Sequence, residues 1–162
     1  LHESGPASDW ARQATLGDRL DIAGPKGSAI VSPQVRNWLL VGDETALPAI
    51  GRRIEEASPG TRITSVLAVA GPGEEQTFVT HADLASIWAH RPKALAADPA
   101  ALMAAVRMVE LQPQTFIWIA AEARVARAVR DYLADQQGHP RNWIKAAGYW
   151  VAGRADAHEK FA

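Results

Sequence analysis

Short apolar runs alternate with stretches of helical periodicity along most of this chain. Residues 37–41, 61–69 and 115–120 are apolar runs of the length expected for buried strands, and 61–69 is rich in β-branched residues. Apolar positions between residues 46 and 54 follow the spacing of a helix that begins directly after the first run. We therefore predict a strand, a turn and a helix, followed by a second strand.

The second half of the chain repeats this alternation. Asp98 followed by Pro99 is typical of a helix start, and residues 100–110 continue with apolar positions at helical intervals. The strand at 115–120 leads into an Ala-rich helix predicted at 122–136. Weaker strand signals lie within 78–88, mainly at 86–89, and at 143–149. Strands and helices in this order predict an α/β fold, a parallel sheet flanked by helices.

The first 35 residues have a different pattern. A short amphipathic piece at 9–14 precedes residues 17–23, where polar and apolar positions alternate with a period of two. This alternation is typical of an antiparallel barrel, and the segment is too short to close one. We therefore predict two parts: a barrel remnant at 1–35 and the α/β domain at 36–162. The barrel and the start at Leu1 suggest a fragment of a longer protein, with the rest of the barrel upstream.

Composition narrows the possible functions. The net charge is −1, from 17 basic and 18 acidic side chains, which gives little support to binding of nucleic acid or of an anionic membrane. No apolar stretch approaches the roughly 20 residues that span a bilayer. Cysteine is absent, which excludes disulfides and thiolate sites and permits a reducing cytoplasm. The five histidines show no paired spacing, so no protein-held metal is expected.

Polar residues gather where two predicted strands end, and carboxyl ends of parallel strands are where such sheets bind ligands. These residues are Gly42, Asp43, Glu44, Thr45, Ala121 and Glu122. The first turn has one glycine and two carboxylates, and the chain has no G-x-G-x-x-G, so tight capture of a diphosphate is not expected. Thr45 can cap the following helix, with Pro48 in its first turn. Simple helix capping explains both turns about as well as ligand binding does.

Six segments carry a resemblance to a known family: HESGPASDWA, GDRLDIAGPKGS, WLLVGDETALPAI, WAHR, FIWIAAEARVARAVRDYL and GYWVAGRADAHE. In order and approximate spacing they resemble siderophore-interacting proteins, the flavin-dependent ferric-siderophore reductases. The resemblance covers nearly the whole chain. It implies a ferredoxin-reductase-like NAD(P)H-binding domain after the end of an FAD-binding barrel. The family's barrel carries an Arg-x-Tyr-[Ser/Thr] motif, which does not occur here.

The resemblance also implies where cofactors bind. Around the FAD phosphates it places Gly5, Pro6, Ala7, Ser8 and Trp10. Facing the nicotinamide it places both strand-end turns, although Ala121 stands where the family has a glycine that lets the ring approach. Tyr149 and Trp150 would face the flavin and the nicotinamide rings. Four other tryptophans are expected in the core: Trp38, Trp88, Trp118 and Trp143.

Cations at strand ends could hold a 2′-phosphate or an anionic ferric chelate. The candidates by position are Arg91, Lys93, Arg141 and Lys145, of which Arg91 and Lys145 are the predicted contacts, although most surface cations are simply solvated. The resemblance thus implies an oxidoreductase that uses FAD and NAD(P)H to reduce a ferric siderophore and release Fe(II), with no catalytic side chain. We expect a cytoplasmic monomer, inactive without the upstream FAD-binding domain of the same protein. The alternative is a non-catalytic nucleotide-binding or regulatory α/β module, favoured by Ala121 and by the missing barrel motif.

Overall fold

The computed structural model describes residues 6–23, 31–154 and 157–161 of the 162-residue chain. It divides into two compact units, Leu1–Ser32 and Pro33–Ala162, which are described separately below. The division falls close to the predicted boundary at residue 35.

The larger unit is built on a six-stranded sheet with the order β3-β2-β1-β4-β5-β6. Five strands are parallel, and the short β6 runs antiparallel to β5. Their bounds are β1 Asn37–Asp43, β2 Arg62–Val69, β3 Asp83–His90, β4 Thr115–Glu122, β5 Ile144–Trp150 and β6 Glu159–Lys160. The predicted parallel α/β sheet is confirmed. From β1 the chain adds β2 and β3 on one side and then returns to add β4 and β5 on the other, so the strand order reverses between β1 and β4, at the centre of the sheet.

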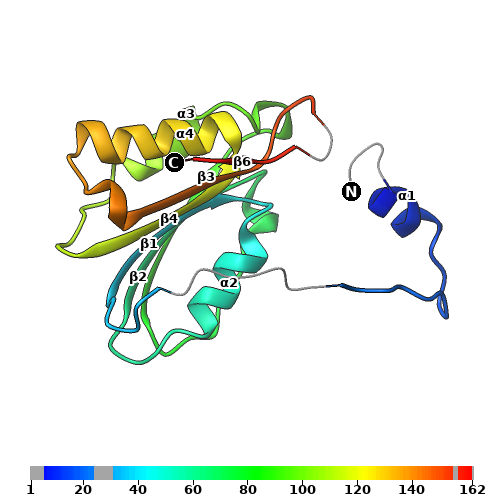
Figure 1. Cartoon of the computed structure of the whole chain (residues 1–162), viewed down its shortest axis with the longest axis horizontal. Helices are drawn as coiled ribbons and strands as arrows, with labels where there is room; N and C mark the ends of the chain where they lie inside the picture. Colours follow the sequence, from blue (N-terminus) through cyan, green and yellow to red (C-terminus); the bar gives the residue numbers. More distant parts are fainter. Residues whose placement is uncertain (1–5, 24–30, 155–156, 162) are drawn as a thin grey trace. The chain divides into compact units, whose positions relative to one another are not determined.

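Helices cover both faces of the sheet, as Figure 1 shows. One face carries α2 (Leu47–Glu55), and the other carries α3 (Ala100–Val106) and α4 (Ala123–Asp131). A π-helical turn at Tyr132–Gln136 continues α4. Short 3₁₀ turns lie at Pro72–Glu74, Lys93–Leu95 and Arg141–Trp143.

Alternation along the central strands explains this layering. Leu39 and Val41 of β1 are buried in the cluster that includes the inner sides of α3 and α4. Gly42 lies on the opposite face, under α2, where a Cβ would be 2.6 Å from the Ala46 Cβ and 2.9 Å from the Ala120 carbonyl oxygen. Only glycine therefore lets α2 begin this close to the sheet.

The element boundaries differ from the prediction at the strand ends. β1 continues through Gly42 and Asp43, and β4 continues through Ala121 and Glu122, so these residues belong to strands and not to turns. In the other direction, α3 ends at Val106, short of the predicted residue 110. β6 was not predicted, because a two-residue strand leaves no periodic pattern.

The smaller unit contains the helix α1 (Pro6–Gln13), which confirms the predicted amphipathic piece. The alternation at residues 17–23 forms no strand among the described residues 14–23, and these residues are exposed. The alternation typical of a barrel therefore does not correspond to a strand among these residues. A period of two forms a stable strand only when a partner strand pairs with it. The barrel remnant stays a prediction, and residues 24–30 lie outside the described residues.

Candidate functional site

Asp43 joins the carboxyl ends of three strands. Its side chain lies at the end of β1 and is only 2% exposed. Oδ2 accepts hydrogen bonds from the backbone N–H of Glu122 on β4, at 2.8 Å, and from the indole Nε1–H of Trp150 on β5, at 2.9 Å. The two predicted strand-end turns and the aromatic tail are therefore brought together at one edge of the sheet, as the prediction required.

Thr45 donates the remaining two hydrogen bonds to Asp43. The other carboxylate oxygen, Oδ1, accepts from the Thr45 backbone N–H at 2.9 Å and from its hydroxyl at 2.6 Å. The prediction that Thr45 caps α2 is wrong, because its hydroxyl donates backwards to Asp43 and the capping residue, Ala46, makes no side-chain bond. Pro48 does lie in the first turn, where its missing N–H costs little.

Glu122 is fully buried and caps α4. Its Oε2 accepts from the backbone N–H groups of Arg124, at 2.7 Å, and Val125, at 3.2 Å. Its Oε1 accepts from the backbone N–H of Ala152, at 3.1 Å, in the turn that follows β5. The capping interpretation is confirmed for Glu122. The carboxylate also ties the C-terminal turn to the edge of the sheet, which the sequence did not predict.

The aromatic residues of β5 occupy two environments. Trp150 is half-buried and faces Asp43, whereas Tyr149 is 42% exposed and meets Trp118 of β4 edge-on, with ring centroids 5.9 Å apart. Partial burial raises the pKa of the Tyr149 phenol above its ordinary value. Gly148 precedes them under α4, where a Cβ would lie 2.8 Å from the Ala123 Cα.

Arg91 and Glu44 form an ion pair across the same edge. The guanidinium follows β3 and is almost fully buried, and it donates from two nitrogens to the two Glu44 carboxylate oxygens at 2.9 and 2.7 Å. This bidentate geometry is the strong form of the interaction. The predicted anion-binding arginine therefore already holds an anion, supplied by the turn after β1.

The other predicted residues lie elsewhere. Lys145 is exposed near the amino end of β5, five residues or about 17 Å along the strand from Trp150. The expectation that it joins the strand-end group is wrong, because the register places it beside Trp118. Of the predicted FAD ligands, Gly5 lies outside the described residues. Pro6, Ala7, Ser8 and Trp10 lie in α1, within the smaller unit.

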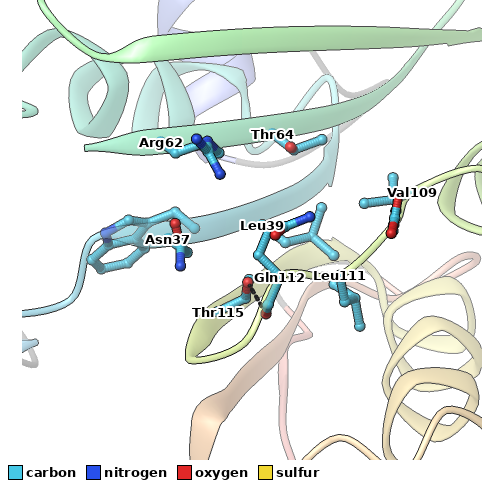
Figure 2. Close-up of a pocket in the computed structure, with 10 residues that line it drawn as sticks. Asn37, Leu39, Arg62, Thr64, Val109, Leu111, Gln112 and Thr115 are labelled. Carbon is cyan, nitrogen blue, oxygen red and sulfur yellow. Dashed lines mark hydrogen bonds between the residues drawn. The ribbon is translucent and has the colours of Figure 1, made fainter. Parts of the chain in front are cut away.

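The hollow in Figure 2 lies at the opposite, amino end of the sheet. It is lined by residues that include Asn37, Arg62, Gln112 and Thr115, and its volume is about 20 Å³. This is room for about one water molecule and not for a nucleotide. Among residues 6–23, 31–154 and 157–161, no three potential ligand side chains are grouped to hold a metal ion. No helix in that part of the chain is long and apolar enough to cross a membrane.

Comparison with known proteins agrees with the resemblance seen in the motifs. Residues 35–153 match the family described as Siderophore-interacting protein, and residues 1–29 match the Siderophore-interacting FAD-binding domain. The chain belongs to the siderophore-interacting protein family. It is 33% identical over 156 residues to the NADPH-dependent ferric-chelate reductase of Escherichia coli (strain K12), a match that covers 94% of this chain and 59% of that protein.

Two solved structures of siderophore-related proteins share the fold. A siderophore utilization protein from T. fusca has a TM-score of 0.83 and 32% identity, over 96% of this chain and 60% of that one. The siderophore-interacting protein SipS from Aeromonas hydrophila has a TM-score of 0.77 and 25% identity, over 95% and 60% of the two chains. This chain therefore spans about three-fifths of the length of the relatives that it matches.

Sequence reasoning missed two features of this family member's site. One is the Glu44–Arg91 pair, whose partners are 47 positions apart. The other is Trp118, which was assigned to the core but is half-buried against Tyr149. Trp88 and Trp143 are also half-buried, and only Trp38 is fully buried as expected. The missing information was the pairing of β4 with β5, because it brings side chains that are distant in the sequence onto neighbouring strands.

Proposed function

We propose that this chain is the pyridine-nucleotide-binding part of a reductase that acts on ferric siderophores. The observation that carries the proposal is the meeting of Asp43, Glu122 and Trp150 where the chain crosses over between β1 and β4. Parallel sheets bind ligands at such a point. The E. coli relative, named an NADPH-dependent ferric-chelate reductase, supports the substrate class. The match at residues 1–29 supports FAD as the second cofactor, held by a domain that includes this segment.

The described residues fit the ring end of a nicotinamide nucleotide better than its diphosphate. The first amides of α4 are occupied by Glu122, and the Thr45 amide before α2 is occupied by Asp43. A diphosphate would have to displace one of these carboxylates. A flat ring instead needs an aromatic surface and nearby backbone, and the exposed part of Tyr149 offers the first.

Ala121 does not obstruct this site. The family resemblance raised the concern that its methyl group would keep the ring away from the backbone. Ala121 is fully buried, in the core cluster on the face covered by α3 and α4. Its methyl group therefore packs into the protein interior, and we propose that the neighbouring backbone remains accessible to the ring.

Arg91 is the proposed contact for an anionic group, either a nucleotide phosphate or the ferric chelate. Its burial fixes the guanidinium, whereas the Glu44 side chain is 33% exposed and stands on a turn. An incoming anion would take the place of the Glu44 carboxylate on the same two nitrogens. Lys145 is not included in this proposal, because it lies far from the strand ends.

The chemistry in this proposal comes from the cofactors. When bound, FAD would supply the chemistry that links hydride transfer from a reduced nucleotide to one-electron reduction of Fe(III), whose reduced form the chelator holds less tightly. The chain's own residues orient the rings and exclude water, and no described side chain is assigned a proton-transfer role.

Thermal melting of the full chain with NADH, NADPH or FAD tests the proposal. A ligand that binds only the folded state raises the melting temperature, so we expect a rise with a reduced pyridine nucleotide. The Tyr149→Ala variant should show a smaller rise, while Asp135→Asn, an exposed carboxylate on the π-helical turn, should match the wild type. No rise with any nucleotide, even in the full-length protein, would favour the alternative, a non-catalytic module. The observation that favours this alternative is that protein carboxylates already occupy the amides at the starts of α2 and α4, where a nucleotide phosphate would otherwise bind.

A further inference from the structure

We propose that Asp43 and Glu122 are positioning residues. In this proposal they brace the end of β5 and the turn that follows it, residues 150–154, and do not bind the cofactor directly. The proposal deepens the proposed function, on which its consequence for nucleotide binding rests. It departs from the family resemblance, which placed both carboxylates against the nicotinamide.

Asp43 has no acceptor capacity left for a ligand. A carboxylate offers about four lone-pair positions, two on each oxygen. Thr45 donates two hydrogen bonds to Oδ1, and Glu122 and Trp150 donate one each to Oδ2. With its side chain 2% exposed and four donors in place, Asp43 can act on a bound nucleotide only through the groups that it holds.

Glu122 is also occupied by hydrogen bonds from the protein. It is 0% exposed and accepts two hydrogen bonds from the start of α4 and one from the Ala152 backbone. The Ala152 bond is the important one here, because it fixes the turn after β5. That turn closes between Val151 and Arg154 and contains Gly153 with a positive φ of 75°. Its backbone is thus held by its own bridge and by the Glu122 side chain.

The two carboxylates together set the position of the aromatic tail. Trp150 pairs with Glu122 in the sheet, immediately after a register shift between Ala121 and Glu122. Its indole reaches from β5 past the end of β4 to Asp43 on β1. Asp43 therefore holds the ring while Glu122 holds the backbone that follows it. The exposed Tyr149 next to them inherits its position from this brace.

Charge is essential to the brace. Neither carboxylate forms a salt bridge with a described cation, and all seven donors are neutral N–H or O–H groups. Hydrogen bonds to an ionised acceptor are roughly twice as strong as neutral ones. In Asp43→Asn the size of the side chain is retained, but one oxygen becomes an NH₂ group that faces existing donors.

Indole N–H resonances in the NMR spectrum of the full chain test the brace without any ligand. The six tryptophans give six such resonances, and Trp150→Phe identifies the one from Trp150. We expect the Trp150 indole proton to exchange with solvent about tenfold more slowly than that of the exposed Trp10. The free energy of a hydrogen bond to a charged group is large enough to slow exchange by this factor or more. In Asp43→Asn the resonance should shift and lose this protection.

Two controls separate the brace from general loosening. The Trp38 indole donates to the Val35 carbonyl at 3.3 Å and should keep its resonance in Asp43→Asn. Asp83→Asn makes the same substitution at an exposed carboxylate on β3 and should leave Trp150 unchanged. Glu122→Gln should move the Ala152 amide resonance. A Trp150 indole that exchanges as fast as Trp10, or is unmoved by Asp43→Asn, overturns the proposal.

If Asp43→Asn does not fold, two measurements still decide the question. They are the protection of the indole in the wild type and the shift of the Glu122 amide in Trp150→Phe, which shares the same acceptor oxygen. With a nucleotide bound, Asp43→Asn combined with Trp150→Phe should weaken affinity no more than the larger single effect. If the loss of affinity in the double variant equals the product of the losses in the two single variants, Asp43 acts on the ligand directly. Because the indole measurement needs no nucleotide, it stands even where the proposed function fails.

Discussion

The two ends of the same parallel sheet are stabilised by different chemistry. At the carboxyl end, buried carboxylates on β1 and β4 accept hydrogen bonds from groups far away in the chain, and the buried Arg91 pairs with Glu44. At the amino end (Figure 2), neutral side chains close loops, as when the Thr115 hydroxyl donates to the Gln112 carbonyl at 2.7 Å. The ion pair there, Arg62 with Asp83, is exposed.

This contrast follows from the cost of burying charge. A buried carboxylate is tolerated only when donors satisfy it fully, so each one at the carboxyl end fixes several groups at once. A neutral hydroxyl at the amino end needs only one partner and fixes one loop. We therefore infer that the carboxyl end is the more rigid and the more sensitive to single substitutions, as a site that orients two rings requires.

Replacing Asp43 should have the largest effect. Asp43→Ala leaves the Glu122 amide and the Trp150 indole without acceptors inside the protein, and we expect the free energy of unfolding to fall by about 3 kcal/mol or more. Urea denaturation measures this loss. Asp83→Ala at the other end should change the midpoint little, because the ion pair is exposed. Equal losses at both positions would contradict the contrast between the two ends.

Removal of the α4 cap should come next. In Glu122→Ala two amides of α4 and the Ala152 amide lose their acceptor, but water can reach the turn, so we expect a loss of about 2 kcal/mol. The matched control is Asp98→Ala, which removes an exposed carboxylate that accepts from the Ala100 amide. A smaller loss for Glu122→Ala than for Asp98→Ala would show that burial does not strengthen the cap.

A neutral contact at the amino end should matter less. Thr115→Val keeps the shape of a side chain that is 4% exposed and removes its hydrogen bond to the Gln112 carbonyl. We expect a loss of about 1 kcal/mol, the usual net worth of one neutral hydrogen bond. Denaturation under the same conditions as for Asp43→Ala sharpens the comparison. If Thr115→Val lowers the free energy of unfolding as much as Asp43→Ala does, the two ends of the sheet do not differ in their sensitivity to substitution.

The smallest effect should be a pH dependence at the amino end. Burial lowers the pKa of His139 below 6.5 and outweighs the opposing hydrogen bond to the Thr115 carbonyl. Below pH 6.5 the unfolded chain therefore binds more protons at this residue, so stability should decrease as pH falls and level off below the folded-state pKa. Melting curves from pH 7 to pH 5 should show a shallower decrease in His139→Gln. An unchanged slope in the variant would assign the dependence to other groups.

Local pattern was sufficient to predict most of the architecture. The apolar runs became β1, β2 and β4, and the stretch at 46–54 became α2, because backbone periodicity depends on near neighbours. The weaker signal at 143–149 was also correct, since β5 covers Ile144–Trp150. The alternation at 17–23 is typical of a barrel, but it forms no strand among the described residues, where no partner strand pairs with it.

The sequence by itself determined which residue types stand at the strand ends, and therefore where a site could form. Only the tertiary structure decided their roles, because their partners are remote: 79 residues separate Asp43 from Glu122, and 107 separate it from Trp150. Thr45 illustrates the difference. Its residue type predicted that it would cap α2, but in the structure its hydroxyl donates to the buried Asp43 carboxylate instead. Hydrogen-bond competition among groups that meet only after folding leaves no trace in local periodicity.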